Sequence, residues 1–347
     1  MTVERQSGYR VHDWGAVPVW EEFERPRPGP GEVLVQVEAC GVGLTVLNCI
    51  NGDLANDPTL LPRVPGHEFA GRVIDAGPGA DRDLIGRRVV PYFYLSCGAC
   101  PECRAGRDSL CRRLRGWVGV HVDGGYAPFA VLPAHNAVPV PEELDPVAAT
   151  VVPDAVATPV HVCGTRARVR PQDRVAVIGA GGGVGIHMVQ VAMLFGARVA
   201  ALDVDDGKLA ALEELGATPV RSDRFASIDA AGLWSQGAPT VVIDLLGSAE
   251  SLAWASGALA PGGRLVLLTT FRGLSIDVDP REMVFGETTV LGTRYAARAE
   301  LDLAAGLVAD GRIRPVVGQV VAPGDVLDLH EQLRQGRLLG RGAIRWR

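Results

Sequence analysis

The sequence lacks several features that would place the protein in a special class. No apolar run approaches the roughly 20 residues of a membrane span, so we expect no membrane partner. The net charge of −6 argues against nucleic acid as a partner. Residues 1–7 show no signal-peptide segment, which predicts a cytoplasmic location. No internal repeat or low-complexity tract is visible, and 347 residues suffice for two domains with their own cores.

A short apolar run followed by clustered glycines indicates a dinucleotide-binding turn. Val175–Ile178 predicts a buried strand, and apolar residues at helical spacing predict a helix over 185–195. A turn without side chains lets a pyrophosphate approach, and the helix N-terminus offers it free N–H groups. The residues expected to contact the cofactor here are Gly179, Gly181, Gly182, Gly183, Val184 and Gly185.

A carboxylate ends the next apolar run. Arg198–Leu202 predicts a second strand, and Asp203 follows it where dinucleotide sites hold the adenosine ribose hydroxyls. A carboxylate there disfavours the extra phosphate of NADP, so we predict NAD(H). The alternative is that Asp203 only caps a helix starting near Asp206. Lys208, in that helix, is included among the expected cofactor contacts.

The order of predicted elements gives an α/β fold class. The first part is β-rich, with short strands separated by Gly and Pro. From about Ala155, buried strands alternate with helices, which implies right-handed crossovers and a parallel, doubly wound sheet. The strands predicted in the first part are 33–39, 68–74, 88–93 and 127–132. Those predicted in the second part are 174–178, 199–202, 240–245 and 263–269, with helices at 185–195, 208–215 and 249–258. The last part predicts helices at 301–310 and 326–335 and a strand at 342–346.

Four of the seven cysteines lie within fifteen residues. Such a cluster in a cytosolic protein favours a metal site over disulfides. Cys97, Cys100, Cys103 and Cys111 can surround a tetrahedral Zn²⁺, and a site with four Cys ligands is structural. An iron–sulfur centre is the alternative, but the fourth cysteine lacks the proline that follows it in ferredoxins.

Taken in order, these parts resemble the medium-chain dehydrogenase/reductase superfamily, in its zinc-containing, alcohol-dehydrogenase-like branch. The motifs that carry the resemblance are Gly66-His67-Glu68, the cysteine lobe, the late Rossmann domain and Gly340-Arg341-Gly342. The resemblance implies a GroES-like catalytic domain over 1–154, including the lobe at 97–111. It also implies a Rossmann domain over 155–294 and a return to the catalytic domain over 295–347. By analogy with the family we expect a homodimer or homotetramer, in which the strand-like stretch 274–278 pairs across a two-fold axis.

The sequence departs from this family at the catalytic zinc. The position of the ligand cysteine holds Gly43, and Val46 replaces the aspartate that orients the ligand histidine. His67 remains, and Asp154 stands at the third-ligand position. Three interpretations are open: no catalytic metal binds; His67, Glu68 and Asp154 hold zinc; or Cys40 or Cys49 substitutes. We favour the first, because loss of an orienting group alone weakens metal binding about 10–100-fold.

The resemblance implies roles for further residues. Thr45 stands at the family's proton-relay hydroxyl, and we assign catalysis to Thr45 and His67, with Asp154 orienting His67. A turn hydroxyl is the alternative for Thr45, and a buried structural histidine is the alternative for His67. Four further cofactor contacts carry over from the family: Thr158, Thr269, Thr270 and Arg341.

Three functions are compatible with these residues. The leading one is NAD(H)-dependent reduction of a small molecule's C=C bond conjugated to a carbonyl, without catalytic zinc. The second is an alcohol dehydrogenase or ketone reductase with an unusual zinc site at His67, Glu68 and Asp154. The third is an inactive NAD(H)-binding protein.

Overall fold

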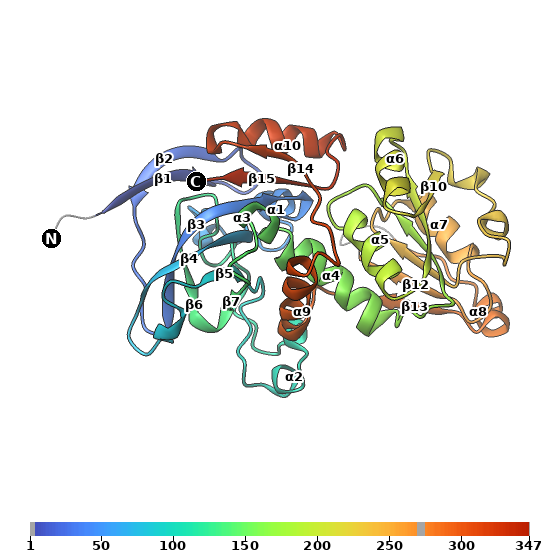
Figure 1. Ribbon diagram of the computed structural model, residues 1–347, viewed down its shortest axis with the longest axis horizontal. Helices are drawn as coiled ribbons and strands as arrows, with labels where there is room; N and C mark the ends of the chain where they lie inside the picture. Colours follow the sequence, from blue (N-terminus) through green and yellow to red (C-terminus); the bar gives the residue numbers. More distant parts are fainter. Residues whose placement is uncertain (1–3, 269–274, 347) are drawn as a thin grey trace. The chain divides into compact units, whose positions relative to one another are not determined.

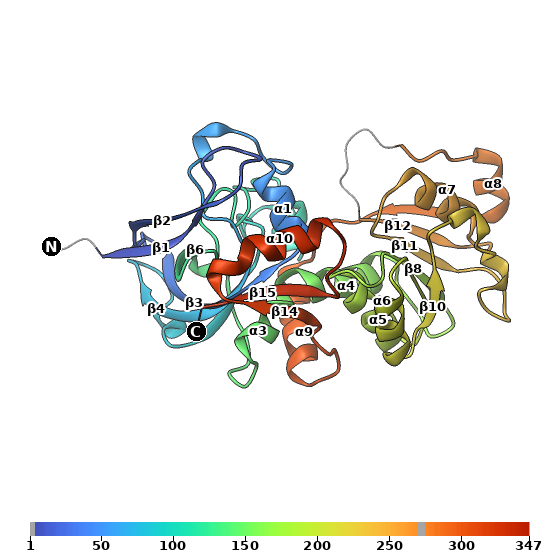
Figure 2. The same cartoon turned by 90° about the horizontal axis from the view of Figure 1, so that it is seen from above.

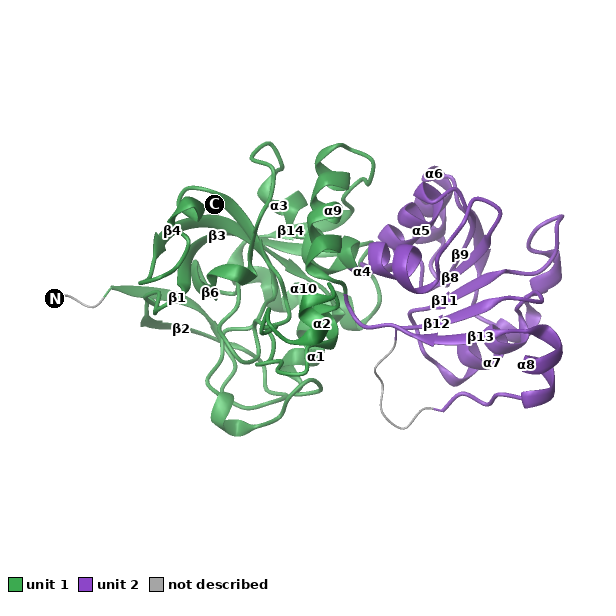
Figure 3. Cartoon of the chain, turned by 90° about the horizontal axis from the view of Figure 1, so that it is seen from below, with its two compact units in different colours: residues 1–157, 296–347 green, residues 158–295 purple. Residues whose placement is uncertain are grey.

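The computed structural model describes residues 4–268 and 275–346, and these divide into two compact units. Unit 1 comprises residues 1–157 and 296–347, and unit 2 comprises residues 158–295 (Figure 3). Unit 1 is therefore built from both ends of the chain. Thr269 and Thr270, predicted to contact the cofactor, lie outside the described residues.

The elements follow one another along the chain as Figure 1 labels them. The strands are β1 (Arg5–Arg10), β2 (Val19–Glu24), β3 (Glu32–Val42), β4 (Glu68–Ala76), β5 (Arg88–Pro91), β6 (Phe129–Pro133), β7 (Ala137–Pro139), β8 (Arg174–Ile178), β9 (Arg198–Asp203), β10 (Thr218–Arg221), β11 (Val241–Asp244), β12 (Arg264–Leu267), β13 (Thr289–Gly292), β14 (Val317–Val321) and β15 (Arg341–Arg345). The α-helices are α1 (Leu44–Ile50), α2 (Pro101–Arg104), α3 (Pro146–Ala149), α4 (Ala157–Val160), α5 (Gly185–Leu194), α6 (Asp206–Glu214), α7 (Ala249–Gly257), α8 (Pro280–Gly286), α9 (Arg298–Ala309) and α10 (Val326–Arg334).

Unit 2 is a doubly wound parallel sheet. In the part of the chain that the structure describes, its strand order is β10-β9-β8-β11-β12-β13, and every neighbouring pair is parallel. Helices α5 and α6 lie on one face of the sheet, and α7 and α8 lie on the other (Figure 3). This order reverses between β8 and β11, which is the dinucleotide-binding topology. The α/β fold class is confirmed.

The central strands of unit 2 are apolar throughout because both faces of the sheet are covered. Strand β8 reads Arg-Val-Ala-Val-Ile, and its residues 175–178 are buried. Strand β9 is likewise buried from Val199 to Asp203. These strands hold the glycine turn and Asp203 at their carboxyl ends, so the core of unit 2 positions the predicted cofactor residues.

Unit 1 is organised around the long strand β3. It pairs antiparallel with β4, β6 and β15, so the C-terminal strand lies beside one from the start of the chain (Figure 2). The β15 register sets Gly342 opposite Val42, which brings Arg341 to the level of Gly43. Helix α10 packs on β15: a Cβ on Gly342 would lie 2.5 Å from Leu329.

Several elements differ from the sequence predictions. The antiparallel pair β1–β2 was not predicted, because its second strand, Val-Trp-Glu-Glu-Phe-Glu, is rich in glutamate. Strand-like residues 275–278 form no strand in the described part of the chain, and Leu274 lies outside it.

A helical stretch from Pro146 to Arg166 was also missed, since prolines usually end helices. Two of its segments, Val152–Val156 and His161–Arg166, are π-helical. By length and composition alone this stretch is apolar enough to cross a membrane, so the expectation that no run approaches that length is wrong. Because 83% of its most apolar window is buried within the protein, the stretch packs as a core helix.

Candidate active site and metal sites

The glycine turn after β8 has the geometry of a dinucleotide-binding turn. Gly179 adopts φ +76°, a conformation that other residues rarely take. A Cβ on Gly185, the first residue of α5, would overlap the carbonyl oxygen of Gly179. These two glycines let the helix start directly against the strand, where its free N–H groups can meet a phosphate.

Asp203 is tied to this turn rather than to the next helix. Its Oδ2 accepts a hydrogen bond of 2.8 Å from the backbone N–H of Gly181. The cap of α6 is Asp205, whose Oδ1 accepts from the N–H of Lys208 at 2.9 Å. The helix-capping alternative for Asp203 is therefore wrong. Side chains of Lys208 and Asp203 both border Gly181, which brings the predicted cofactor residues together.

The four cysteines of the lobe converge on one point. Their sulfur atoms lie within 4.8 Å of one another, with 3.5 Å between Cys100 and Cys103 and 3.9 Å between Cys100 and Cys111. A tetrahedral zinc with Zn–S bonds of about 2.3 Å places its sulfurs about 3.8 Å apart. The donor set therefore fits a single zinc ion, and it is too tight to enclose a cluster of several iron atoms.

Backbone N–H groups also favour thiolates in this lobe. The N–H of Cys97 points to the sulfur of Cys111, and the N–H of Cys100 points to the sulfur of Cys97, each at 3.3 Å. Backbone donation, first from Ala99, lowers the pKa of Cys97 to about 6. The backbone therefore favours the thiolate form of Cys97, which is the form that binds a metal.

A second cluster in unit 1 gathers buried polar side chains from distant parts of the chain. His67 precedes β4 and Glu68 begins it; Asp154 lies in the π-helical segment 152–156, and Arg341 begins β15. All four residues are buried. The ring of Phe93 lies 4.2 Å from the imidazole ring of His67, centroid to centroid.

The guanidinium of Arg341 connects the two carboxylates. Its Nη2 donates to Glu68 Oε1 at 2.6 Å and to Asp154 Oδ2 at 2.9 Å. The hydroxyl of Thr45 donates to the same Asp154 oxygen at 3.4 Å, so it does not serve only its own turn. Arg341, predicted as a pyrophosphate contact, thus lies in the cluster of predicted catalytic residues. The missing side chain at Gly43 was the one feature of the sequence that could have indicated this position.

His67 is held in the cluster without a hydrogen-bond partner for either ring nitrogen among the described residues. Its Nε2 lies 3.9 Å from Glu68 Oε1 and 4.0 Å from Asp154 Oδ2, beyond hydrogen-bond reach. That Asp154 orients His67 therefore stays a prediction. Burial lowers the pKa of His67 despite the neighbouring carboxylate of Asp154, which favours the neutral imidazole.

Burial acts on the neighbouring acidic groups as well. It raises the pKa of Glu68 to about 8, against the opposing effect of Arg341. It also raises the pKa of the Cys40 and Cys49 thiols, which are buried in the core. Neither cysteine belongs to the group of potential metal ligands formed by His67, Glu68 and Asp154 in the described chain. A substitute thiolate ligand is therefore disfavoured.

A catalytic zinc does not fit this arrangement. Carboxylate oxygens bind zinc at about 2.0–2.2 Å, and the two oxygens that face His67 already receive hydrogen bonds from Arg341. A zinc ion and the guanidinium would compete for the same lone pairs in the same space. The donor types suit zinc, but Arg341 occupies the oxygens nearest His67, so a zinc bound to them would have to displace the guanidinium.

Two further residues are buried in the structure. Thr158 is buried on α4, and its contact with the cofactor stays a prediction. Tyr92 is a core residue whose hydroxyl donates to Ala296 O at 2.8 Å.

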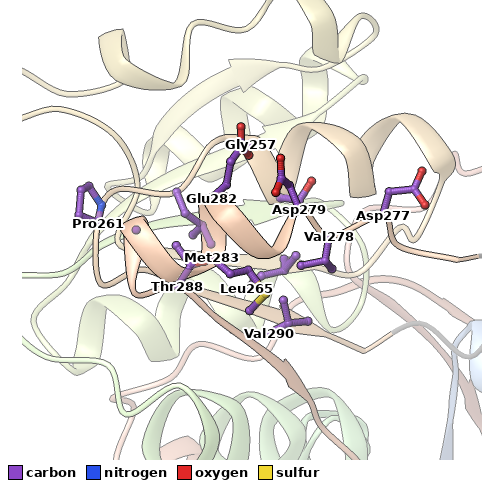
Figure 4. Close-up of a pocket in the computed structure, with 13 residues that line it drawn as sticks. Gly257, Pro261, Leu265, Asp277, Val278, Asp279, Glu282, Met283, Thr288 and Val290 are labelled. Carbon is purple, nitrogen blue, oxygen red and sulfur yellow. The ribbon is translucent and has the colours of Figure 1, made fainter.

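A pocket of about 160 Å³ lies in unit 2 beside α8. Its labelled lining includes Leu265, Met283, Val290, Asp277, Asp279 and Glu282 (Figure 4). The carboxylates disfavour an anionic cofactor, and Asp279 caps α8 by accepting from the N–H of Arg281 at 2.7 Å. None of the predicted site residues that the structure describes lines this pocket.

Comparisons with known proteins agree with the fold. Residues 29–142 match the alcohol dehydrogenase GroES-like domain, and residues 183–310 match the zinc-binding dehydrogenase family. An alcohol dehydrogenase of Geobacillus stearothermophilus is 31% identical over 337 residues, covering 92% of this chain and 93% of the relative. The structure of a cobalt- and zinc-bound thermostable alcohol dehydrogenase from Pyrobaculum aerophilum has a TM-score of 0.87 and 33% identity, covering 99% of this chain and 100% of that one. The acetophenone reductase of Geotrichum candidum NBRC 4597, in complex with NAD, has a TM-score of 0.86 and 26% identity, covering 99% and 98%.

Proposed function

Because this chain belongs to the zinc-type, alcohol-dehydrogenase-like branch of the medium-chain dehydrogenase/reductase superfamily, and is thus an oxidoreductase, we propose that it reduces a C=C bond conjugated to a carbonyl. The electron donor is NADH, and the reaction proceeds without a catalytic zinc. The observation that carries the proposal is the guanidinium of Arg341, which binds the carboxylates of Glu68 and Asp154 where a zinc would need them.

The chemistry explains why this arrangement favours a conjugated substrate. Zinc in such enzymes lowers the pKa of an alcohol and polarises a carbonyl oxygen. Hydride addition to a conjugated C=C bond needs less help, because the substrate spreads the incoming charge onto its own oxygen. Hydrogen-bond donors then suffice to stabilise that oxyanion.

Each residue of the cluster has a separate role in the proposed reaction. NADH supplies the hydride, which adds to the β-carbon while the electron pair of the C=C bond moves to the carbonyl oxygen. Neutral His67 has ring nitrogens without a partner in the described chain, so it can donate to that oxygen. A proton then reaches the α-carbon from solvent through the hydroxyl of Thr45, which Asp154 holds. The products are the saturated carbonyl compound and NAD⁺.

The test measures the turnover of a panel of substrates through the decrease in NADH absorbance. We expect turnover of α,β-unsaturated ketones or enoyl thioesters, little turnover of simple alcohols, and no loss of activity on brief exposure to a chelator. His67→Ala should lower kcat by about 100-fold, the usual effect of removing one oxyanion donor. His12→Ala, at an exposed histidine, is the control. Chelator-sensitive oxidation of alcohols would favour the zinc alternative, and NADH binding without any turnover would favour an inactive protein.

Asp203 supports the choice of NADH over NADPH. It ends β9, beside the glycine turn, where a ribose hydroxyl is expected. Asp203→Ala should weaken NADH binding by about 10–100-fold, the effect of losing one charge-assisted hydrogen bond, and should narrow the preference over NADPH. Fluorescence titration with both cofactors measures this. Asp205→Ala, which removes the cap of α6, is the matched control, and an equal loss in both variants would indicate a structural effect only.

Three further properties belong to the proposal. The cysteine lobe holds a structural zinc, supported by the spacing of its sulfur atoms. A homodimer or homotetramer and a cytoplasmic location stay predictions from the sequence.

A further inference from the structure

We propose that the guanidinium of Arg341 takes the place of the catalytic metal ion and keeps the cluster of His67, Glu68 and Asp154 closed to zinc. The inference rests on the proposed metal-free reaction and deepens it, because it names what replaces the metal. It requires three conditions. The guanidinium must fit in the cluster, ion pairs must hold it there, and a metal ion must be unable to bind at the same position.

Room for the guanidinium comes from the absent side chain at Gly43. A Cβ at this position would overlap Arg341 Nη1 and would lie 2.5 Å from Arg341 Cζ. Gly43 has an extended backbone, with φ −137° and ψ 178°, so other residues could adopt its conformation. A larger residue here would therefore displace the guanidinium, whereas the backbone conformation does not require glycine. The absence of a side chain at Gly43 therefore removes the thiolate ligand and also leaves the space that the guanidinium of Arg341 occupies.

Charge and backbone pairing keep the guanidinium in place. The side chain of Arg341 is 4% exposed, and it is bonded to two carboxylates that are 1% and 12% exposed. The backbone N–H of Arg341 donates to Val316 O at 3.0 Å, which anchors the start of β15. Moving the guanidinium away would leave a buried carboxylate without its cation, and this cost keeps the side chain in place.

A metal ion cannot share this position. Zinc bound to Glu68 Oε1 and Asp154 Oδ2 would lie about 2.0–2.2 Å from each, and Nη2 of Arg341 already lies 2.6 and 2.9 Å from the same atoms. Two cations this close in a buried site would repel each other strongly. The guanidinium therefore supplies the cation between the two carboxyl groups, at a position where zinc would otherwise bind.

The experiment counts metal ions per chain and follows cobalt absorbance, so it needs no substrate. Wild-type protein and Arg341→Met are each titrated with Co²⁺, with and without NADH. Methionine removes the charge and leaves Gly43 unchanged. We expect the wild type to bind about one ion, in the four-cysteine lobe, and Arg341→Met to bind about two. Arg345→Met changes the same residue type on the same strand, at a side chain that is 48% exposed, and should stay at about one.

Two outcomes would overturn the inference: a second ion in the wild type, with or without NADH, or no second ion in a folded Arg341→Met. If Arg341→Met does not fold, Gly43→Cys provides a second variant, since its side chain displaces the guanidinium and supplies a thiolate. A folded Gly43→Cys that binds no second ion also contradicts the inference. The wild type could also bind no second ion and yet reduce no conjugated carbonyl. That result would agree with the inference and would contradict only the proposed reaction.

Discussion

Replacing Arg341 with alanine is expected to lower the free energy of unfolding by about 3–5 kcal/mol, the usual effect of breaking a buried ion pair by removing one partner. The substitution leaves the carboxylates of Glu68 and Asp154 buried beside each other without their common cation. Arg341 opposes the effect of burial, which raises the pKa of Glu68 to about 8, so removing the guanidinium raises that pKa further. The loss of stability should therefore grow as the pH rises above about 8, where Glu68 of the wild type ionises.

Urea denaturation of protein purified without added metal measures this effect. Arg345→Ala is the matched control: its ion pair with Asp145 spans 3.7 Å between side chains that are 48% and 54% exposed. Such a pair contributes at most about 1 kcal/mol. Adding Glu68→Gln to Arg341→Ala should recover part of the loss. Equal effects of the two arginine variants would show that Arg341 does not anchor the cluster.

Replacing Cys103 with serine is expected to release the zinc of the lobe and unfold residues 97–111. The lobe has no apolar core of its own, since its buried cluster consists of cysteines with Leu114 packed against them. Structural zinc contributes about 10–16 kcal/mol of binding energy in isolated zinc-binding peptides, more than a loop this small can replace. We expect cleavage by trypsin after the lobe's arginines, such as Arg104 and Arg107, to become at least about tenfold faster.

Zinc analysis and limited proteolysis together test this expectation. Cys163→Ser is the control, because that buried thiol belongs to unit 2 and lies 3.7 Å from the sulfur of Met188. It should keep the zinc and the trypsin resistance of the lobe. A zinc-free Cys103→Ser that resists trypsin as well as the wild type would contradict a structural role for the metal. The lobe also contacts α9 through Asp108, which accepts from the N–H of Arg298 at 3.3 Å.

Local patterns allowed most of the fold and of the cofactor site to be predicted. Strand β8, its glycine turn and α5 are contiguous, and each follows from residue spacing within about twenty positions. The cysteine lobe is equally local. Strand β10 and strand β13 escaped prediction because their four-residue runs carry polar ends, and neighbouring strands define them rather than their own sequence.

The arrangement of the catalytic cluster could not be predicted in the same way. Gly43 and Arg341 are brought together by the pairing of β3 with β15, which joins the two ends of the chain. The sequence showed that Gly43 removes a ligand, but it did not show what fills the space. The resemblance to the family predicted that Arg341 contacts the pyrophosphate. In the structure its side chain is buried and donates hydrogen bonds to Glu68 and Asp154.

The most direct test of this account is the zinc content of wild-type protein purified without added metal. Elemental analysis should give about one zinc per chain, held by the four cysteines of the lobe. About two per chain would mean that His67, Glu68 and Asp154 bind zinc despite Arg341. That result would contradict the metal-free mechanism and turn the search for substrates to alcohols and ketones.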